Sequence, residues 1–401
     1  MVLIRWAGLA FLAVNLAHAT SGHLTSRAPS AENILAAAEA LQGWYNPSKG
    51  LWDSTNWWNS ANCLTVLANW ALVDVSRSRQ IDVPSIIANT FEKAQRDVLR
   101  VRKTIRESGL IESRYDLHAN KRGFTEFLNE YYDDEGWWAL ALIRAWDVTR
   151  HGPYLDMAER IFRDMQGGVD DTCGGGIWWS KARDYKNAIA NELYLSVAAS
   201  LANRVPTREG EYVRIAADTW AWFKASGMIN QDGLVNDGLD ILPDGRCVNN
   251  GRPTWTYNQG VLLGGLVELA VATGNGSVLD QAVRTAKAAL AALTDDEGIL
   301  REATGCEPNC GADGSQFKGI FMRNLAYLQR AAPNDEFLVA ILRNADAVWA
   351  KNRNEKNQFG ISWSGPPEAG GGPNASTHSS ALDVVVAARA VVEANGAVSN
   401  G

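Results

Sequence analysis

The sequence predicts an all-α fold class, a single (α/α)6 barrel of six helical hairpins, from two observations. Alternating Val, Ile and Thr runs typical of strands are nearly absent, whereas apolar residues recur with helical periodicity along most of the chain. The tripeptide Gly-(Leu/Ile)-X also returns roughly every 60 residues, an interval long enough for two helices and a short extended segment. Six such hairpins can close into one ring, with the Gly-rich loops gathered at one face. The six copies begin at Gly50, Gly109, Gly176, Gly233, Gly298 and Gly360.

Ten segments carry the apolar spacing of helices. Each has about 11 to 16 residues and is bounded by Gly, Asn or Asp, which favour helix ends. The short Pro- and Gly-rich stretch 365–376 is the single linker candidate, so we expect one catalytic domain over residues 20–401. The predicted helices span residues 31–41, 63–75, 137–148, 188–202, 210–225, 261–272, 278–293, 318–330, 337–350 and 382–394.

Residues 1–19 predict a secretory signal peptide. Arg5 precedes a short apolar run over residues 6–16, and an A-x-A sequence at 17–19 marks the cleavage site. A buried first helix is the alternative. The last residues, 393–401, are polar and small and lack the hydrophobic tail of a GPI signal. We therefore expect a secreted, extracellular, monomeric protein without a membrane anchor.

Composition favours a protein that binds carbohydrate and disfavours one that binds nucleic acid. The 401 residues carry a formal charge of −7, whereas surfaces that bind nucleic acid are usually basic. Trp is the commonest aromatic residue, with 16 copies against 10 Tyr and 10 Phe. Flat indole rings can stack on sugar rings while carboxylates bond sugar hydroxyls, so an acidic, Trp-rich chain is typical of carbohydrate-active proteins.

The cysteines predict disulfides rather than a metal site. Secreted chains form disulfides, and the candidate pairs are Cys306 with Cys310 and Cys173 with Cys247, whereas Cys63 lies in an apolar helical stretch and is expected as a buried free thiol. No H-x-x-H, HExxH, G-x-S-x-G, GxGxxG or P-loop motif is present, so we expect no metal and no cofactor. The mature chain keeps His23, His118, His151 and His378, and N-glycosylation sequons begin at Asn275 and Asn374.

The most informative segment is Tyr-Tyr-Asp-Asp-Glu-Gly-Trp-Trp at 131–138, ahead of a strongly helical stretch. One Asp suffices to cap a helix, whereas Asp133, Asp134 and Glu135 accumulate like charge with no cation nearby in sequence. Like charge raises the pKa of one carboxyl, which allows one acid and one ionised carboxylate at the same site. Adjacent residues at a loop-to-helix junction can hold their carboxyls about 5 Å apart, as in retaining glycosidases. Helix capping alone is the alternative.

Other segments combine aromatic rings with amides and carboxylates, which suit sugar hydroxyls. The triple Gly at 174–176 lets backbone approach a ligand, although a tight turn with Trp in the core is the alternative. Asn187, Asn191 and Glu192 share one side of a helix that faces either solvent or an axial cavity, and Lys318 could neutralise a carboxylate or simply be solvated. The candidate substrate-binding residues are Tyr132, Trp137, Trp138, Trp178, Trp179, Asn191, Glu192, Asn236, Asp237, Trp255, Tyr257, Asn258, Gln259, Lys318 and Trp363.

At these residues the sequence resembles glycoside hydrolase family 76, the endo-α-1,6-mannanases and their fungal wall-associated relatives. The matching motifs are YYDDEGWWALALIRAWD, CGGGIWWS, YKNAIANELYL, DGLVNDGL, NNGRPTWTYNQGVLLGG and FKGIF, in that order along nearly the whole mature chain. The resemblance implies an (α/α)6 barrel and retaining hydrolysis of internal α-1,6-mannosidic bonds in mannan and manno-oligosaccharides. It also implies that Asp133 is the nucleophile and Asp134 the general acid/base.

Three alternatives to this hydrolase remain at the level of sequence. Some fungal relatives are GPI-anchored and are thought to transfer mannan-linked glycans at the cell wall, and an unanchored transglycosylase would have the same features as this chain. A non-catalytic mannan-binding protein is disfavoured by the intact Asp pair. A sugar epimerase or unsaturated uronyl hydrolase on the same fold is disfavoured because His151 and His378 fall outside the aromatic motifs.

Overall fold

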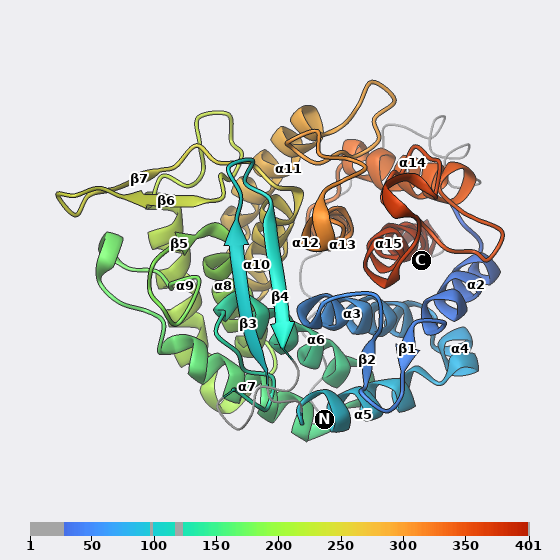
Figure 1. Ribbon diagram of the computed structural model, residues 1–401, viewed down its shortest axis with the longest axis horizontal. Helices are drawn as coiled ribbons and strands as arrows, with labels where there is room; N and C mark the ends of the chain where they lie inside the picture. Colours follow the sequence, from blue (N-terminus) through green and yellow to red (C-terminus); the bar gives the residue numbers. More distant parts are fainter. Residues whose placement is uncertain (1–27, 97–98, 117–122, 400–401) are drawn as a thin grey trace.

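The computed structural model describes residues 28–96, 99–116 and 123–399. The predicted signal peptide, His23 and His118 lie outside these residues. Within them helices dominate, and the predicted (α/α)6 barrel is confirmed (Figure 1).

Six hairpins follow one another, each made of an outer helix, a connection that contains a β-bridged turn, and an inner helix. Outer helices bury one stripe of residues, as expected for an amphipathic helix on a core, whereas every residue of the inner helix α8 is buried. The outer helices are α2 (Ala31–Gln42), α5 (Val83–Ala94), α7 (Gly152–Gln166), α9 (Glu209–Ala225), α11 (Leu279–Leu293) and α14 (Asp335–Lys351). The inner helices are α3 (Trp57–Val73), α6 (Tyr132–Thr149), α8 (Ala188–Ala202), α10 (Thr256–Thr273), α13 (Phe317–Ala331) and α15 (Ala375–Ser399). The connection is long in the second hairpin, between α5 and α6, and in the fourth, between α9 and α10. Two short helices are α4 (Val75–Ser78) and α12 (Gly311–Gly314).

The inner helices close into a ring. Each packs against the next along the chain, from α3 through α6, α8, α10 and α13 to α15, and α15 packs back against α3. The same order can be followed around the centre of Figure 1. Because each outer helix precedes its inner partner, the N-terminal ends of the inner helices follow the β-bridged turns and lie at one end of the barrel.

The repeated Gly-(Leu/Ile) tripeptide lies in these turns, and helix side chains hold the turns in place. The backbone N–H of Ile177 donates to Asn191 Oδ1 over 2.8 Å, and that of Val235 donates to Gln259 Oε1 over 2.8 Å. In each of these turns a buried side-chain oxygen accepts the hydrogen bond of a backbone N–H, so this N–H needs no water as a partner. Similar bonds join Trp52 to Ser60, Leu300 to Asn344 and Phe359 to His378.

Two β-sheets cover the end of the barrel that carries the turns, in addition to the small hairpin of β1 (Tyr45–Asn46) and β2 (Leu51–Trp52). The sequence pattern does not predict the first, because each of its strands has only two apolar or aromatic residues, four positions apart, among polar and charged ones. In Figure 1 the β3–β4 hairpin crosses the front of the barrel, and β6–β7 projects to the left. The strands are β3 (Arg100–Ile105) with β4 (Ile111–Asp116), and β5 (Lys186–Asn187) with β6 (Gly238–Ile241) and β7 (Cys247–Asn249).

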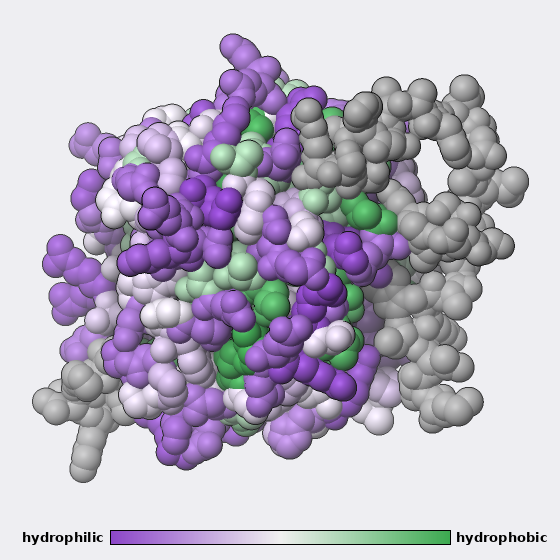
Figure 2. All heavy atoms as spheres, turned by 90° about the vertical axis from the view of Figure 1, so that its right-hand side faces the viewer, coloured by the Kyte–Doolittle hydropathy of each residue, from purple (hydrophilic) through white to green (hydrophobic). Residues whose placement is uncertain are grey.

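Two disulfides tie the loops. Cys173 bonds Cys247 across 74 residues, and Cys306 bonds Cys310. Cys63 is a buried free thiol, and burial raises its pKa to about 12. In the part of the chain that the structure describes, no helix is both long and apolar enough to cross a bilayer. The face shown in Figure 2 is mostly hydrophilic, with an apolar strip near its centre.

Candidate active site

Asp133 and Asp134 lie in the first turn of α6, at the end of the barrel that carries the turns. This helix begins at Tyr132, five residues before the predicted start, so both residues are helical rather than in the preceding loop. Their carboxylates therefore lie near the positive end of the helix dipole. Only 5% of the Asp133 side chain and 0% of the Asp134 side chain are exposed. The pair is buried where water screens charge weakly.

Four hydrogen bonds reach the carboxylate of Asp133. Its Oδ2 accepts from Trp179 Nε1 over 2.9 Å and from Lys103 Nζ over 2.9 Å. Its Oδ1 accepts from the backbone N–H of Asp134 over 2.9 Å and from Lys103 Nζ over 3.1 Å. Donors on both oxygens stabilise the ionised form, as a nucleophile requires.

Lys103 joins the two carboxylates. Its Nζ lies 2.9 Å from Asp133 Oδ2 and 2.5 Å from Asp134 Oδ1. Because one nitrogen lies 2.9 Å from one oxygen and 2.5 Å from the other, these oxygens can be at most about 5.4 Å apart, which is no farther than the carboxyls of retaining glycosidases. Inverting enzymes instead need room for a water between their carboxyls.

The carboxyl of Asp134 has a raised pKa, although the groups that bond it all donate hydrogen bonds to it. Complete burial raises its pKa to about 7; Lys103 opposes this increase, the charge of Asp133 adds to it, and a hydrogen bond from Asn129 lowers it. Its Oδ2 accepts from Tyr115 over 2.9 Å and from Asn129 over 2.7 Å. The two adjacent carboxylates thus differ in surroundings, which is the condition for assigning them different roles.

A group of buried polar side chains beside the pair has unused hydrogen-bonding capacity. Both carboxylate oxygens of Glu192 and the hydroxyl of Tyr257 lack hydrogen-bond partners among the described residues. Asn258 and Oδ1 of Asp237 also make no close hydrogen bond there, although the side chain of Asn258 interacts with Asp237 and lowers its pKa. The charge of Asp133 raises the pKa of both Asp237 and Tyr257, so these groups lie close to the pair. Unpaired buried polar atoms are costly, and a polar ligand can satisfy them.

Burial changes the protonation of this group. It raises the pKa of Asp237 to about 6, although Tyr185 donates to Asp237 Oδ2 over 2.7 Å and favours the ionised form. It raises the pKa of Glu192 well above the ordinary range, which favours the protonated form that can donate as well as accept. Paired donors and acceptors are what the hydroxyls of a sugar require.

The model of glycosyl hydrolase family 76 matches residues 31–400 of this chain. The chain belongs to this family. Among curated relatives, it is 30% identical to mannan endo-1,6-alpha-mannosidase DFG5 of Candida albicans over 239 residues, 56% of this chain and 52% of that protein. It is 25% identical to DFG5 of Saccharomyces cerevisiae over 80% of this chain and 68% of that protein. The match thus spans about half to two thirds of the length of these relatives.

Solved structures of the family share the fold. The α-1,6-mannanase GH76A of Salegentibacter sp. HEL1_6, as an inactive variant with two adjacent Asp residues replaced by Asn and bound to α-1,6-mannotriose, has a TM-score of 0.73. It is 23% identical and covers 90% of this chain and 99% of its own. Dfg5 of Chaetomium thermophilum with glucosamine has a TM-score of 0.69 at 20% identity, over 90% and 91% of the two chains.

Several polar residues that the motifs single out hold this family 76 barrel together instead of facing an open cleft. Asn191 and Gln259 bond the hairpin turns at Ile177 and Val235. The amide of Asn236 donates to the carbonyl of Arg252 over 2.6 Å. Lys318 pairs with Glu307 over 2.8 Å and donates to the carbonyl of Ile361. The polar groups of these four residues thus have hydrogen-bond partners within the protein itself.

The predicted aromatic residues separate into two sets. Trp179 reaches the pair through its indole N–H, and the Tyr257 ring stacks on Phe317 at 3.8 Å beside it. Trp138 instead packs against Trp57 and Phe127 in the core. The remaining predicted rings are also buried by protein contacts; these are Tyr132, Trp137, Trp178, Trp255 and Trp363.

Three residues of the site carry no recognisable signal in the sequence. Lys103 and Tyr115 come from the β3–β4 hairpin, and Asp313 from α12 lies under it, accepting from Trp58 Nε1 over 2.5 Å. A lysine in a polar and charged stretch is usually solvated, so only the folded hairpin shows that Lys103 is 3% exposed and bound to carboxylates. Its pKa is raised because the attraction of Asp133 and Asp134 outweighs the opposing effect of burial.

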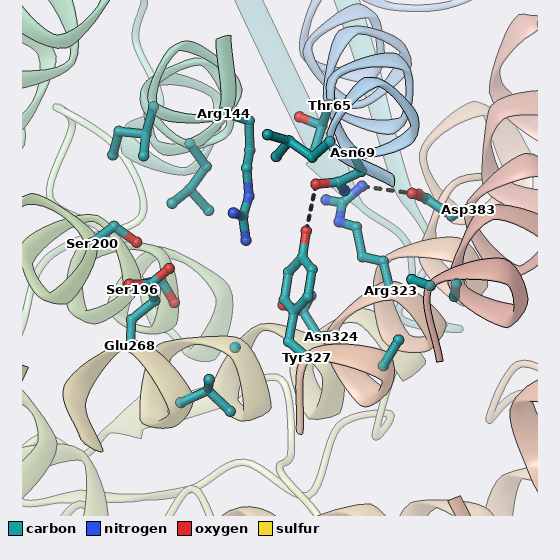
Figure 3. A pocket seen from close by; sticks show the side chains of 18 of the residues that line it. Thr65, Asn69, Arg144, Ser196, Ser200, Glu268, Arg323, Asn324, Tyr327 and Asp383 are labelled. Atoms are coloured by element: carbon teal, nitrogen blue, oxygen red, sulfur yellow. Dashed lines mark hydrogen bonds and ion pairs between the residues drawn. The ribbon is translucent and has the colours of Figure 1, made fainter. Parts of the chain in front are cut away.

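A cavity of about 140 Å³ lies at the other end of the inner helices (Figure 3). Arg144, which points into it, is eleven residues beyond Asp133 on α6, or about 16 Å along the helix. Arginines line this cavity, near the C-terminal ends of the inner helices, which are partly negative. Arg323 also neutralises a carboxylate there, because it bonds Asp383 over 2.9 Å. This cavity is separate from the catalytic pair. Among the described residues no acidic, His or Cys cluster is suited to a metal ion.

Proposed function

We propose that this protein is a retaining endo-α-1,6-mannanase that cleaves internal α-1,6-mannosidic bonds. The observation that supports it is the buried carboxylate pair, whose oxygens share the ammonium of Lys103 and so lie within about 5.4 Å of each other. That separation suits double displacement and leaves no room for the water of an inverting enzyme. The substrate class comes from the relatives, which are named mannan endo-1,6-alpha-mannosidases, and from the mannanase structure that holds α-1,6-mannotriose.

In the first step Asp133 attacks the anomeric carbon and forms a glycosyl ester. Asp134, protonated because its pKa is about 7, gives its proton to the departing glycosidic oxygen. In the second step the ionised Asp134 takes a proton from water, and the resulting oxygen nucleophile breaks the ester with net retention of configuration. The hydrogen bonds from Trp179 and from the backbone N–H of Asp134 also stabilise Asp133 as the leaving carboxylate in this step.

Glu192, Asp237, Tyr257 and Asn258 are the residues we expect to hold the sugar. They supply both donors and acceptors, and their unpaired atoms lie beside Asp133. Ligand hydroxyls would satisfy atoms that the protein leaves unpaired, so each bond gained relieves an existing cost. Phe317 and Tyr257 add a stacked aromatic wall next to them.

Chemical rescue can test both the activity and the order of the pair. Asp133→Ala and Asp134→Ala should each lose more than 10³-fold of kcat on linear α-1,6-mannan, and exposed Asp171→Asn is the control expected to keep it. With an activated α-mannoside, azide should give the β-mannosyl azide from Asp133→Ala and the α-mannosyl azide from Asp134→Ala. The opposite anomers would reverse the roles, and wild-type-like activity in either variant would refute the assignment.

Transfer to a sugar acceptor is the second candidate reaction, and burial of the pair favours it. A site whose carboxylates are 5% and 0% exposed limits the access of bulk water to the glycosyl ester. Products longer than the donor, formed in the presence of manno-oligosaccharide acceptors, would identify a cell-wall mannan transglycosylase. If all the products are shorter than the donor, the reaction is hydrolysis.

We further propose that the protein is secreted. Support comes from the signal-peptide pattern at residues 1–19, the two disulfides and the exposed sequon residue Asn275. The mature protein should begin at Thr20, which N-terminal sequencing of secreted material would show. An intact N-terminus in that material would refute this cleavage.

A further inference from the structure

The β3–β4 hairpin covers the catalytic pair and is attached to it from several directions. One strand brings Lys103 between the two carboxylates, and the other brings Tyr115 to Asp134. In Figure 1 the hairpin lies across the front of the barrel, the end at which α6 begins. Further hydrogen bonds join Val101 to Glu130, the backbone of Lys103 to Tyr131, and Ser113 to Asp313.

The ammonium of Lys103 stands where substrate must react. A nucleophile oxygen approaches the anomeric carbon to about 3 to 3.5 Å, and the acid lies about 2.6 to 3.2 Å from the leaving oxygen. Lys103 Nζ is 2.9 and 3.1 Å from the oxygens of Asp133 and 2.5 Å from Asp134. One nitrogen thus lies within reach of both carboxylates, in the region between them that the scissile bond would also enter.

The hydrogen bonds of Asp134 also differ from those of a working acid. Both of its oxygens accept, from Lys103 on one side and from Tyr115 and Asn129 on the other. Each of these contacts donates to Asp134, and the ammonium of Lys103 beside Oδ1 favours the ionised carboxylate. The closed hairpin therefore occupies the approach to the pair and disfavours the protonated acid.

We propose that Lys103 is a displaceable counter-ion of the catalytic pair, and that the β3–β4 hairpin has to withdraw it before Asp133 and Asp134 can act. The closed state keeps the two buried carboxylates neutralised in the absence of substrate. Withdrawal of Lys103 then removes the cation that favours ionised Asp134, so the acid takes up its proton as the sugar arrives. The remaining groups that face Asp134 are Asp133 on α6, Asn129 before it, Tyr115 on β4 and, under the hairpin, Asp313 on α12.

A lysine-free hairpin should bind substrate more tightly. The apparent Kd equals the intrinsic Kd divided by the fraction of open protein, so weakening the closed state lowers it. Lys103→Met should lower KM for α-1,6-manno-oligosaccharides, and the Kd of α-1,6-mannotriose in calorimetry, at least tenfold. Arg102→Met removes the same charge from the exposed neighbouring position of the strand and should change neither.

Ser113→Ala gives an independent test, because it loosens the hairpin at Asp313 and leaves the charges of the pair intact. It should lower KM in the same direction, and Lys103→Arg, which keeps the cation, should retain a high KM. Thermal unfolding of each variant shows that it is folded, and KM and kcat are compared over pH 4 to 9.

Two results would overturn the inference: unchanged KM and Kd in Lys103→Met and Ser113→Ala, or a Lys103→Met protein that loses kcat at constant KM. The latter would make Lys103 a supporting group of the open site. The inference rests on the proposed function, and failure of the two can be told apart. If no variant binds or cleaves α-1,6-manno-oligosaccharides, both fail; if wild type cleaves them and the variants gain nothing, only the role of Lys103 fails.

Discussion

The strongest prediction of the site concerns the alkaline limb of its pH profile. Asp134 is 0% exposed, and burial moves its pKa from the ordinary 3.8 to about 7. A change of three units corresponds to about 4 kcal/mol between the two protonation states. Because the first step needs the protonated acid, kcat/KM of the free enzyme should fall as pH rises through 7.

The size of the fall follows from that pKa. With half-protonation at pH 7, about 91% of Asp134 is protonated at pH 6 and about 9% at pH 8, so kcat/KM should fall about tenfold between them. Above pH 8 the decrease should approach tenfold per unit. The assay is the initial rate of reducing-end release from an α-1,6-manno-oligosaccharide at substrate concentrations well below KM.

α-Mannosyl fluoride is the matched substrate, because fluoride leaves without a proton from Asp134. The alkaline limb should vanish when its glycosylation step is measured and should persist with the oligosaccharide. A limb near pH 4 to 5 would show that Asp134 is an ordinary carboxyl and that burial does not control it. If the rate with α-mannosyl fluoride decreases at alkaline pH in the same way, a group other than Asp134 causes the decrease.

Two further predictions concern stability. Replacing Cys173 and Cys247 by Ser opens a 74-residue loop and should lower the free energy of unfolding by about 4 kcal/mol. Replacing Cys306 and Cys310 opens a four-residue loop and should lower it by about 2 kcal/mol. Urea unfolding measures both losses, and equal losses would contradict the chain-entropy argument. Arg204→Met removes the arginine that Asp147 and Glu268 share, and it should cost about 3 kcal/mol at pH 7, since Arg144 still pairs with Asp147 and Asn203 still bonds Glu268. Both partner carboxyls have lowered pKa values in the folded protein, so the ion pairs stabilise it above the unfolded pKa of these carboxyls. This stabilisation disappears as pH falls below about 4. If the stability difference between Arg204→Met and wild type stays constant down to pH 2, this role is refuted.

Much of the barrel could be predicted from local pattern. The inner helices are long apolar segments and the turns repeat a Gly-containing tripeptide, so the number of hairpins follows from the sequence. The outer helices α5 and α7 are harder to identify, since α7 begins with Gly152-Pro153, a pair that is also typical of a turn. Asn191 and Gln259 resemble sugar ligands in sequence, yet their hydrogen bonds hold turns, because an amide serves a backbone N–H as well as a hydroxyl.

The sequence by itself determined the repeat, the helical class and the adjacent Asp133 and Asp134, since each depends on residues close together in the chain. Only the tertiary structure decided what surrounds that pair. Lys103 comes from a strand well before α6, and Asp313 comes from a helix in the last third of the chain. Their charges act on the pair only because the fold buries them within a few ångströms of it, where the dielectric is low and water is excluded. Burial and proximity, which control the pKa of Asp134, have no local signature in a sequence.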